Sequence, residues 1–552
     1  MSDTTDAYIS QFTLSHVVGL SVTAADSSLI VAVSGGAAVS TKSGSALGLA
    51  GAATVNIVQT TTDAVIQDST LSNVTGAVAV TATNGARIIS IAAGLGGASQ
   101  GYGIAGSVAY NTITADTEAY VSGGGPITAD SLAIMATDAS SVITVAGSLA
   151  YGGTLGIGAG IAYNDVNPTV KAYLSDADAT ISGALTVQAE NQAFITVVAA
   201  GIAVAVDNPG GLAPGTQGPL TKQQSSKPYG LAAAVGLAID TITADVSAYV
   251  TGDGTDTLSA GSLSVAANDD NSKIVAVAGG VAVGLSNGEQ QGAAAGAGGA
   301  AFAFNNISNS VTAYLSDIRV TSLGNVAVTG ESTADIEAYT IGGAVAGALG
   351  AGTGGSAALA GAGAVTINTI NKDVLAYIND GSSVTTSGRG TVTVSATDQS
   401  TINAVAGGVA VAGALSSGAD QSGTALSVGL SVAENTIQDK TSGGGGGVQA
   451  FIDNSTISAA GDLDVTATST PTITVVSFAG GLALSASLSG KGNSYAAAAS
   501  GAAAINTMTT TVHAAISNTK AVQAPNLTLS AGDNSTVTAT VVGASSRVDG
   551  RR

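Results

Sequence analysis

Residues 450–467 read Ala-Phe-Ile-Asp-Asn-Ser-Thr-Ile-Ser-Ala-Ala-Gly-Asp-Leu-Asp-Val-Thr-Ala, and this order of aromatic slot, polar turn and alternating run returns along the chain. The alternation has a period of two, which is typical of a β-strand with one buried face. The slot of Phe451 is filled in the other copies by Tyr8, Val65, Tyr120, Tyr173, Tyr249, Tyr314, Tyr377 and Ala515. Six residues after each alternating run begins stands Asp26, Asn84, Asp138, Asn191, Asp269, Ser332, Asp398, Ser469 or Asp533. Such recurrence indicates internal repeats.

A second polar column precedes the aromatic slot. It consists of Asn56, Asn111, Asn164, Asp240, Asn305, Asn368, Asn435 and Asn506. The slot follows nine residues later in every copy but one. After Asn435 it follows sixteen residues later, and the seven extra residues accompany the glycine run 443–447. This offset predicts a local insertion within an otherwise constant unit.

The columns divide the chain into repeats. The expected units are a partial repeat 1–25, full repeats 26–83, 84–137, 138–190, 191–268, 269–331, 332–397, 398–468 and 469–532, a partial repeat 533–546, and an unstructured tail 547–552. Within each repeat we expect an Ala/Gly-rich strand, a variable loop, a second Ala/Gly strand ending at the Asn column, the aromatic strand and the alternating strand. Asp, Asn or Gly stands three residues after each aromatic slot of a full repeat, which predicts a turn there.

Stacking such units would bury one continuous core between neighbouring repeats. The sequence therefore predicts an all-β fold, an elongated β-solenoid (β-helix-like) of about eight repeats of 53–78 residues. Equivalent residues of adjacent coils would lie about 4.8 Å apart. The Asn column is then expected to form a ladder of side-chain amide bonds, and the aromatic slot a stack of rings.

The stretch 450–467 and its counterparts resemble the repeats of large bacterial surface adhesins of the filamentous-haemagglutinin and autotransporter-passenger kind. The resemblance covers nearly the whole chain and identifies a style of β-repeat rather than a ligand. It implies an exported, extracellular part of a bacterial cell-surface protein. That part would be a rigid stalk presenting loops to a host cell, a neighbouring cell or a surface.

An alternative function remains open at this point. Both ends of the repeat array are partial repeats, which could complete one another in adjacent molecules. The chain would then be a self-assembling fibre or sheath subunit that polymerises head-to-tail, and its partners would be copies of itself.

The composition excludes several classes of function. The chain has 552 residues, no Cys and two His, which removes disulfides and thiolate metal sites and argues against a His-based catalytic triad. Fifteen Lys and Arg against 36 Asp and Glu give a net charge of −21, which argues against nucleic-acid binding. The uncharged stretch Ala338–Asn371 is mostly small residues, unlike a membrane helix. We expect neither enzymatic activity nor a membrane span.

The largest insertion, 207–230, is the first candidate for binding. It contains Lys222, Lys227 and Tyr229. Long loops on rigid scaffolds often carry recognition. A tolerated surface loop is the simpler interpretation, and the residues themselves name no ligand.

Acidic turns are the second candidate. Asp253, Asp256, Asp269 and Asp270 place carboxylates close together in the sequence. Calcium takes about six to eight oxygen ligands, and neither an EF-hand loop nor a calcium-binding nonapeptide occurs. We therefore expect no metal or cofactor, with calcium at these residues as the one option left open.

Overall fold

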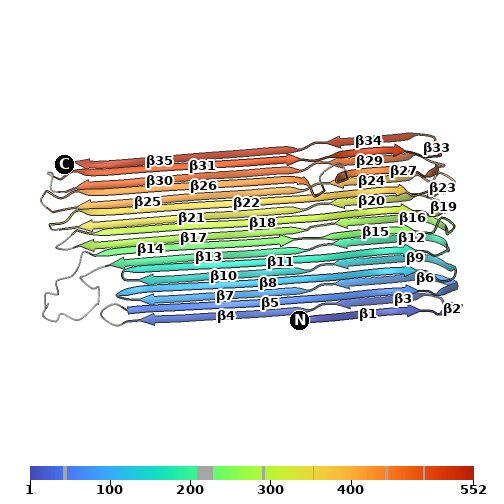
Figure 1. The fold of residues 1–552 in the computed structure, drawn as a ribbon, viewed down its shortest axis with the longest axis horizontal. Helices are drawn as coiled ribbons and strands as arrows, with labels where there is room; N and C mark the ends of the chain where they lie inside the picture. Colours follow the sequence, from blue (N-terminus) through green and yellow to red (C-terminus); the bar gives the residue numbers. More distant parts are fainter. Residues whose placement is uncertain are drawn as a thin grey trace.

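The computed structural model describes residues 1–41, 46–207, 228–288, 292–351, 353–418, 420–441, 445–488 and 492–551. These residues form an all-β structure of three parallel sheets, as the alternating pattern predicts (Figure 1). Parallel neighbours need long crossover connections. Here the crossover out of each sheet is made by strands of the other two sheets, which is the arrangement of a β-helix-like stack.

Sheet C contains one strand from each passage of the chain. In chain order its strands are β4 (Leu29–Ser40), β7 (Arg87–Ala98), β10 (Ser141–Gly152), β13 (Phe194–Asp207), β17 (Lys273–Gly288), β21 (Asp335–Gly350), β25 (Thr401–Ser416), β30 (Thr472–Ser487) and β35 (Thr536–Arg551). These strands begin just after the Asp/Asn/Ser column and are rich in Val, Ala and Gly.

Sheet A contains the longest strands. They are β1 (Ser2–Ser10), β5 (Ala46–Gln67), β8 (Gly101–Ser122), β11 (Leu155–Ser175), β14 (Tyr229–Ile242), β15 (Asp245–Thr251), β18 (Ala294–Ser316), β22 (Ser356–Asn379), β26 (Gly423–Asp439), β27 (Gly447–Asp453), β31 (Ser494–Thr509) and β32 (Val512–Ser517). Five of these twelve strands, β5, β8, β11, β18 and β22, carry both the Asn column and the aromatic slot.

Sheet B contains the alternating runs. Its strands are β2 (Thr13–Ser15), β3 (Leu20–Asp26), β6 (Thr70–Asn84), β9 (Ile127–Asp138), β12 (Ala179–Asn191), β16 (Thr257–Asp269), β19 (Arg319–Ser322), β20 (Val326–Ser332), β23 (Ser383–Thr386), β24 (Val392–Asp398), β28 (Thr456–Ser458), β29 (Leu463–Ser469), β33 (Ala521–Gln523) and β34 (Leu527–Asp533). The chain passes from sheet C to sheet A to sheet B and back to sheet C.

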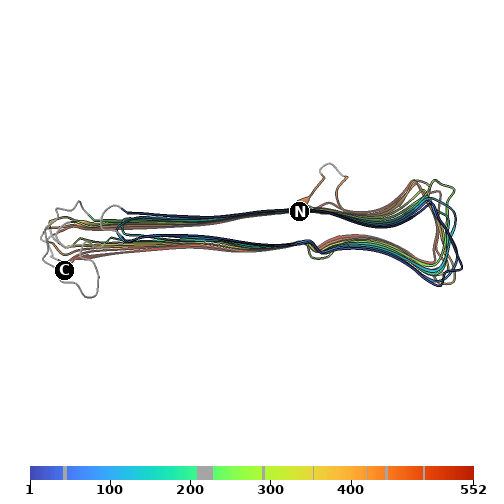
Figure 2. The same cartoon turned by 90° about the horizontal axis from the view of Figure 1, so that it is seen from below.

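The cross-section has two unlike parts, which Figure 2 shows side by side. In the first part, sheet C runs close to the half of sheet A that precedes the Asn column; we call this double layer the blade. In the second part, the rest of sheet A faces sheet B across a wider space; we call this part the wedge. The Asn column lies where the two parts meet.

The blade is thin because Gly and Ala line its interior. A Cβ atom added to Gly36 of sheet C would lie 2.1 Å from the carbonyl oxygen of Gly51 in sheet A, and one added to Gly299 would lie 2.0 Å from that of Gly343. Side chains larger than hydrogen would therefore force the sheets apart. Toward the loop edge the core is a cluster of buried alanines.

The wedge has an ordinary apolar core. Buried Leu, Ile and Val from sheet B, such as Leu132 and Ile134, pack against inward-facing residues of sheet A in one continuous cluster. Burial of such side chains stabilises a fold by about 1.5–3 kcal/mol each. The wedge therefore supplies the large-side-chain packing that the blade lacks.

Turns join sheet A to sheet B at the predicted place. The backbone is left-handed, with φ of 47–61°, three residues after the aromatic slot at Gln11, Asp68, Gly123, Asp176, Asp317, Asp380, Asn454 and Asn518. In the remaining repeat the positive φ falls on Gly254 (83°). Gly, Asn and Asp tolerate this conformation, so the predicted turn is confirmed.

Two expectations about strand ends are wrong. The second Ala/Gly strand does not end at the Asn column, because β5, β8, β11, β18 and β22 continue through it to the aromatic slot. The column side chain points inward and bonds along the stack, so the backbone pairing is not interrupted. Residues 547–551 are not an unstructured tail either. They extend β35, and Arg547 and Arg551 are register partners of Ala483 and Ser487.

The molecule is elongated along its strands, whereas the sequence analysis predicted elongation along the stacking direction. The longest axis of the molecule follows the strands rather than the stacking direction (Figure 1). The 24-residue strand β22 spans about 80 Å at 3.3 Å per residue. The nine strands of sheet C stack to only about 40 Å at 4.8 Å per step. The molecule is therefore a broad plate.

Candidate functional site

The Asn column forms a ladder of buried side-chain hydrogen bonds. Each Nδ2 donates to the Oδ1 of the next residue, in the pairs Asn56–Asn111 (2.7 Å), Asn111–Asn164 (2.8 Å), Asn164–Asp240 (2.7 Å), Asn305–Asn368 (2.7 Å), Asn368–Asn435 (2.8 Å) and Asn435–Asn506 (2.9 Å). Hydroxyl groups of sheet C add bonds in the early coils. Thr144 Oγ1 donates to Asn164 Oδ1 at 2.6 Å. An amide both donates and accepts, so the chain of bonds can continue through every Asn.

The ladder is interrupted between Asp240 and Asn305. These two residues are register partners, yet Asp240 Oδ2 and Asn305 Oδ1 both lack a hydrogen-bond partner. An ionised carboxylate cannot donate, so two acceptors stand in successive coils. The register of sheet C replaces Thr144 with Val197 and then Ala276, so the hydroxyl group is also lost. Burial raises the pKa of Asp240 to about 7, and the bond from Asn164 opposes that rise.

The aromatic slot forms a continuous stack of rings on the outer face of sheet A. Adjacent ring centroids from Tyr120 through Tyr173, Tyr249, Tyr314 and Tyr377 to Phe451 lie 4.6–4.9 Å apart, with interplanar angles of 4–10°. Each inner ring covers the faces of its neighbours, so only ring edges and hydroxyl groups face solvent. Burial raises the pKa of Tyr377 to about 12. The arrangement stabilises the stack but offers no series of open ring faces to a ligand.

The Asp/Asn/Ser column forms a second buried polar line where sheet B ends. Asp269 accepts hydrogen bonds from Asn191 Nδ2 (2.7 Å), Ser272 Oγ (2.5 Å), Asn309 Nδ2 and Ser332 Oγ (3.3 Å). Burial raises the pKa of Asp269, and these four donors lower it. Its oxygens are thus occupied within the protein.

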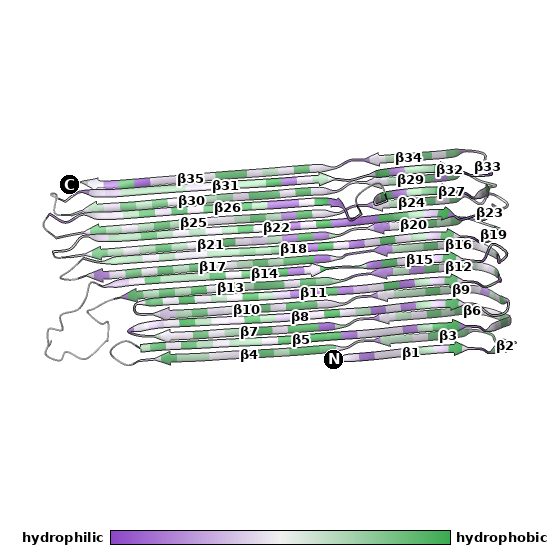
Figure 3. Ribbon diagram, in the orientation of Figure 1, coloured by the Kyte–Doolittle hydropathy of each residue, from purple (hydrophilic) through white to green (hydrophobic). Residues whose placement is uncertain are grey.

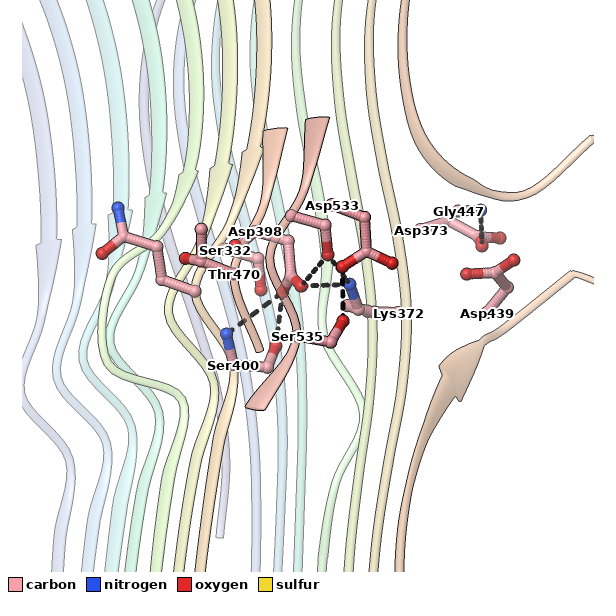
Figure 4. Close-up of polar contacts among 12 residues, drawn as sticks. Ser332, Lys372, Asp373, Asp398, Ser400, Asp439, Gly447, Thr470, Asp533 and Ser535 are labelled. Atoms are coloured by element: carbon pink, nitrogen blue, oxygen red, sulfur yellow. Dashed lines mark hydrogen bonds and ion pairs between the residues drawn. The ribbon is translucent and has the colours of Figure 1, made fainter. Parts of the chain in front are cut away.

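One member of this line contains a buried ion pair that the sequence analysis missed. Lys372 Nζ lies against Asp398 Oδ2 and donates to Ser469 Oγ at 3.3 Å, and the Lys372 and Asp398 side chains are both fully buried (Figure 4). Ser400 Oγ donates to Asp398 Oδ1 at 2.5 Å. A signal was available, because Lys372 stands at an inward-facing position of an alternating strand. Buried lysine is rare unless it is paired.

The predicted seven-residue insertion lies beside this pair. Lys372 pairs with Asp439 and Asp373 with Gly447, so residues 440–446 are the extra segment. Asp373 Oδ1 accepts backbone N–H bonds from Lys440 (3.2 Å), the first residue of the segment, and from Gly447 (2.8 Å), the residue that follows it. Figure 4 shows Asp373 beside Gly447. The carboxylate clamps the base of the insertion.

The residues proposed for binding in the long loop are only partly described. Lys222 and Lys227 lie outside the described residues. Tyr229 begins strand β14, is exposed, and its backbone N–H donates to Asp207 Oδ2 at 2.9 Å. This bond closes the base of the loop at the edge of the blade. It does not identify a ligand.

The four calcium candidates fall in different environments. Asp253 and Asp256 lie in one exposed turn, where Asp256 Oδ2 accepts the Asp253 N–H at 2.9 Å. Asp269 is fully buried and fully bonded, whereas Asp270 is only partly buried. Within the described ranges, no group of three or more His, Cys, Asp or Glu side chains could hold a metal ion.

The two outer faces of the blade form an extended apolar surface that the sequence analysis did not identify. Outward-facing Val, Leu, Ile and Tyr occupy sheet C and the adjoining half of sheet A, for example Val281, Ile341 and Leu349 in sheet C and Leu359 and Leu430 in sheet A. Figure 3 shows hydrophobic and neutral residues over this half and most hydrophilic residues near the middle and in the wedge. The alternating sequence pattern does not reveal this apolar surface, because the inward-facing and the outward-facing positions of the blade strands are both apolar.

A groove crosses the outer face of sheet C. It has a volume of about 410 Å³ and lies among Leu285, Gly347, Leu349, Gly413 and Leu484. In the register of the sheet, Leu285, Gly347, Gly413 and Leu484 occupy one column. Two glycines between two leucines therefore create the hollow, and the neighbouring column places Leu349 and Leu415 beside it as a ridge.

Comparisons with known proteins do not assign the chain to a family. No family model matches it, and comparison with curated proteins and with solved structures found no match. In the part of the chain that the structure describes, no helix has the length and apolarity needed to cross a membrane. The uncharged stretch Ala338–Asn371, for which the sequence analysis expected no membrane span, contributes to strands β21 and β22.

Proposed function

We propose that the chain is a rigid structural and adhesive region of a bacterial cell-surface protein, located outside the cell, in which each repeat of 53–78 residues makes one coil of a β-solenoid. The observation that carries the proposal is the register of the ladder. Equivalent residues of successive passages pair in the same column from Asn56 to Asn506, across loops of very different length. Loop variation on a constant scaffold suits presentation of varied surfaces.

The plate shape refines the role of the proposed stalk. One coil adds about 4.8 Å along the stack, so 53–78 residues yield little length. The same residues yield a face and a looped edge tens of ångströms wide. We therefore propose a scaffold that presents a broad face and a looped edge to a host cell, a neighbouring cell or a surface.

Adhesion to cells tests this proposal. Beads coated with the 552-residue chain should bind host or bacterial cells above the level of beads coated with an unrelated acidic protein. A variant lacking residues 209–226 retains Asp207 and Tyr229, whose 2.9 Å bond closes the loop base. Loss of binding in that variant alone would assign adhesion to the loop. Equal binding by coated and control beads at every density would contradict the adhesive role.

A self-assembling structural subunit is the second candidate. The extended apolar faces of the blade favour it, because a soluble monomer rarely exposes a patch larger than about 300–600 Å². Negative-stain images over a concentration series separate the two roles. Plates of constant size support a scaffold that acts singly, and arrays that grow with concentration support the subunit.

A further inference from the structure

The outer face of sheet C is large enough to form a stable interface. Its strands contain 12–16 residues and stack nine deep, which gives a face of about 40 Å by about 40 Å, or about 1,600 Å². A standard protein interface uses about 800 Å² from each partner. Half of this face would therefore suffice.

The charge distribution allows two such faces to meet. Lys273, Asp335 and Glu337 stand at the start of their strands, where the blade joins the wedge, and Lys273 pairs with both acids at 2.8–2.9 Å. Between this boundary and the loop edge, the strands from β4 to β30 carry one charged residue, Asp207, which ends β13 beside the groove and accepts the Tyr229 backbone N–H at 2.9 Å. Apart from Asp207, whose carboxylate already has a backbone hydrogen-bond donor, contact over this area would bury no charge, although each copy carries a net charge of −21.

The face also carries a hollow and a ridge next to each other. Gly413 forms an open part of the groove, since a Cβ added there would meet nothing within 4 Å. Leu349 and Leu415 project beside it and are 50% and 40% exposed. A two-fold contact requires one patch to complement itself, so that each partner supplies both the inserted and the receiving element. A ridge adjoining a groove meets this requirement.

We propose that the outer face of sheet C is the interface of a two-fold dimer with a second copy of this chain, in which the Leu349–Leu415 ridge of each copy enters the Gly347–Gly413 groove of the other. This inference is independent of the adhesive role and needs no head-to-tail contact. In this dimer the sheet C faces of the two copies pack against each other, whereas head-to-tail polymerisation would join the copies through the ends of the repeat array.

Sedimentation of the full chain tests the dimer. We expect a species of twice 52.3 kDa that increases with protein concentration and with added salt, since salt screens the net charge. The double variant Leu349→Lys with Leu415→Lys should remain monomeric. The matched control is Leu359→Lys with Leu430→Lys, which places the same charges on the sheet A face and should still dimerise. Both variants are less negative than the wild-type chain, so loss of the dimer cannot come from greater net repulsion.

A second variant avoids any effect of charge on folding. Gly413→Leu fills the groove, and the open space at Gly413 accommodates the side chain. We expect at least a tenfold weaker dimer with an unchanged circular dichroism spectrum. A monomeric wild-type chain at all concentrations would overturn the proposal. So would a dimer that survives both sheet C variants or disappears only with the sheet A variant. Co-flotation with phosphatidylcholine–phosphatidylglycerol vesicles, abolished by the sheet C lysines, would assign the face to lipid instead.

Discussion

Replacing Asp240 with Asn should repair the interrupted ladder. Asp240 Oδ1 already accepts a bond from Asn164 at 2.7 Å, while Oδ2 and the neighbouring Asn305 Oδ1 have no partner. An Asn side chain would keep the acceptor and offer an N–H to Asn305. A protonated Asp240 could make the same donation through its O–H, so the wild-type ladder is complete only when this carboxyl group is neutral.

The magnitude follows from the pKa of Asp240. Burial raises that pKa to about 7, against about 3.9 in an unfolded chain. Below pH 4 both states are protonated, and the group has no effect on stability. Between pH 4 and 7 the unfolded chain loses the proton first, so folding stability falls as pH rises. Above pH 7 the loss is complete, at about 4 kcal/mol for three pKa units.

Urea unfolding of both proteins between pH 3.5 and 8 measures this effect. Asp240→Asn should match the wild-type chain at pH 3.5 and exceed its free energy of unfolding by about 4 kcal/mol at pH 8. Only the difference between the two proteins is interpreted, because the other carboxyl groups titrate in both. Asn368→Asp is the matched control. It introduces an acid into an unbroken part of the ladder and should show the opposite dependence on pH.

A difference between wild type and Asp240→Asn that stays constant from pH 3.5 to 8 would refute this reasoning. A midpoint near pH 4 would also refute it. That result would mean that the Asp240 carboxyl group ionises in the folded protein as easily as in water.

Two further substitutions test the blade and the buried ion pair. Gly299→Ala should lose about 1–3 kcal/mol of stability through overpacking, since its Cβ would lie 2.0 Å from the Gly343 oxygen, whereas Gly298→Ala meets nothing within 4 Å and should be neutral or slightly stabilising in thermal unfolding. Equal effects of the two would mean that the sheets are not in close contact. Lys372→Met should lose about 3–5 kcal/mol because it leaves the buried Asp398 carboxylate unpaired. Adding Asp398→Ser should restore most of that loss in urea unfolding, and failure to do so would show that Lys372 acts through packing rather than charge.

Much of the fold could be predicted because residues that pair between adjacent coils recur at equivalent positions of the repeat. Columns of Asn, Tyr and Asp recur only if successive passages of the chain align, and alternation with period two identifies the strands. The continuity of β5 or β22 through the Asn column could not be predicted in this way. Polar residues usually mark strand ends, and only the axial amide bonds show that Asn56 or Asn368 belongs inside a strand.

The shape of the plate could not be derived from the repeat either. Alternation shows that two faces differ but not which layer covers each face. In the blade, Gly and Ala face inward and Val, Leu and Ile face outward, which reverses the usual rule that large apolar residues are buried. The usual rule would place larger side chains such as Val281 and Leu349 in the core, and the apolar outer surface would then not be predicted.

The unusual composition and the unusual width have one physical cause. The wedge part of each coil already contributes to one continuous apolar core. The remaining residues build the blade, whose interior is lined mainly by small residues, Gly, Ala and Ser, because the two sheets lie close together. The blade thus adds two broad faces to each coil and little interior volume. Most residues of a coil therefore widen the two outer faces and do not lengthen the stack. Such a molecule is better suited to contact through its broad faces than to spanning a distance. For this reason we place the interaction on the sheet C face rather than at the ends of the stack.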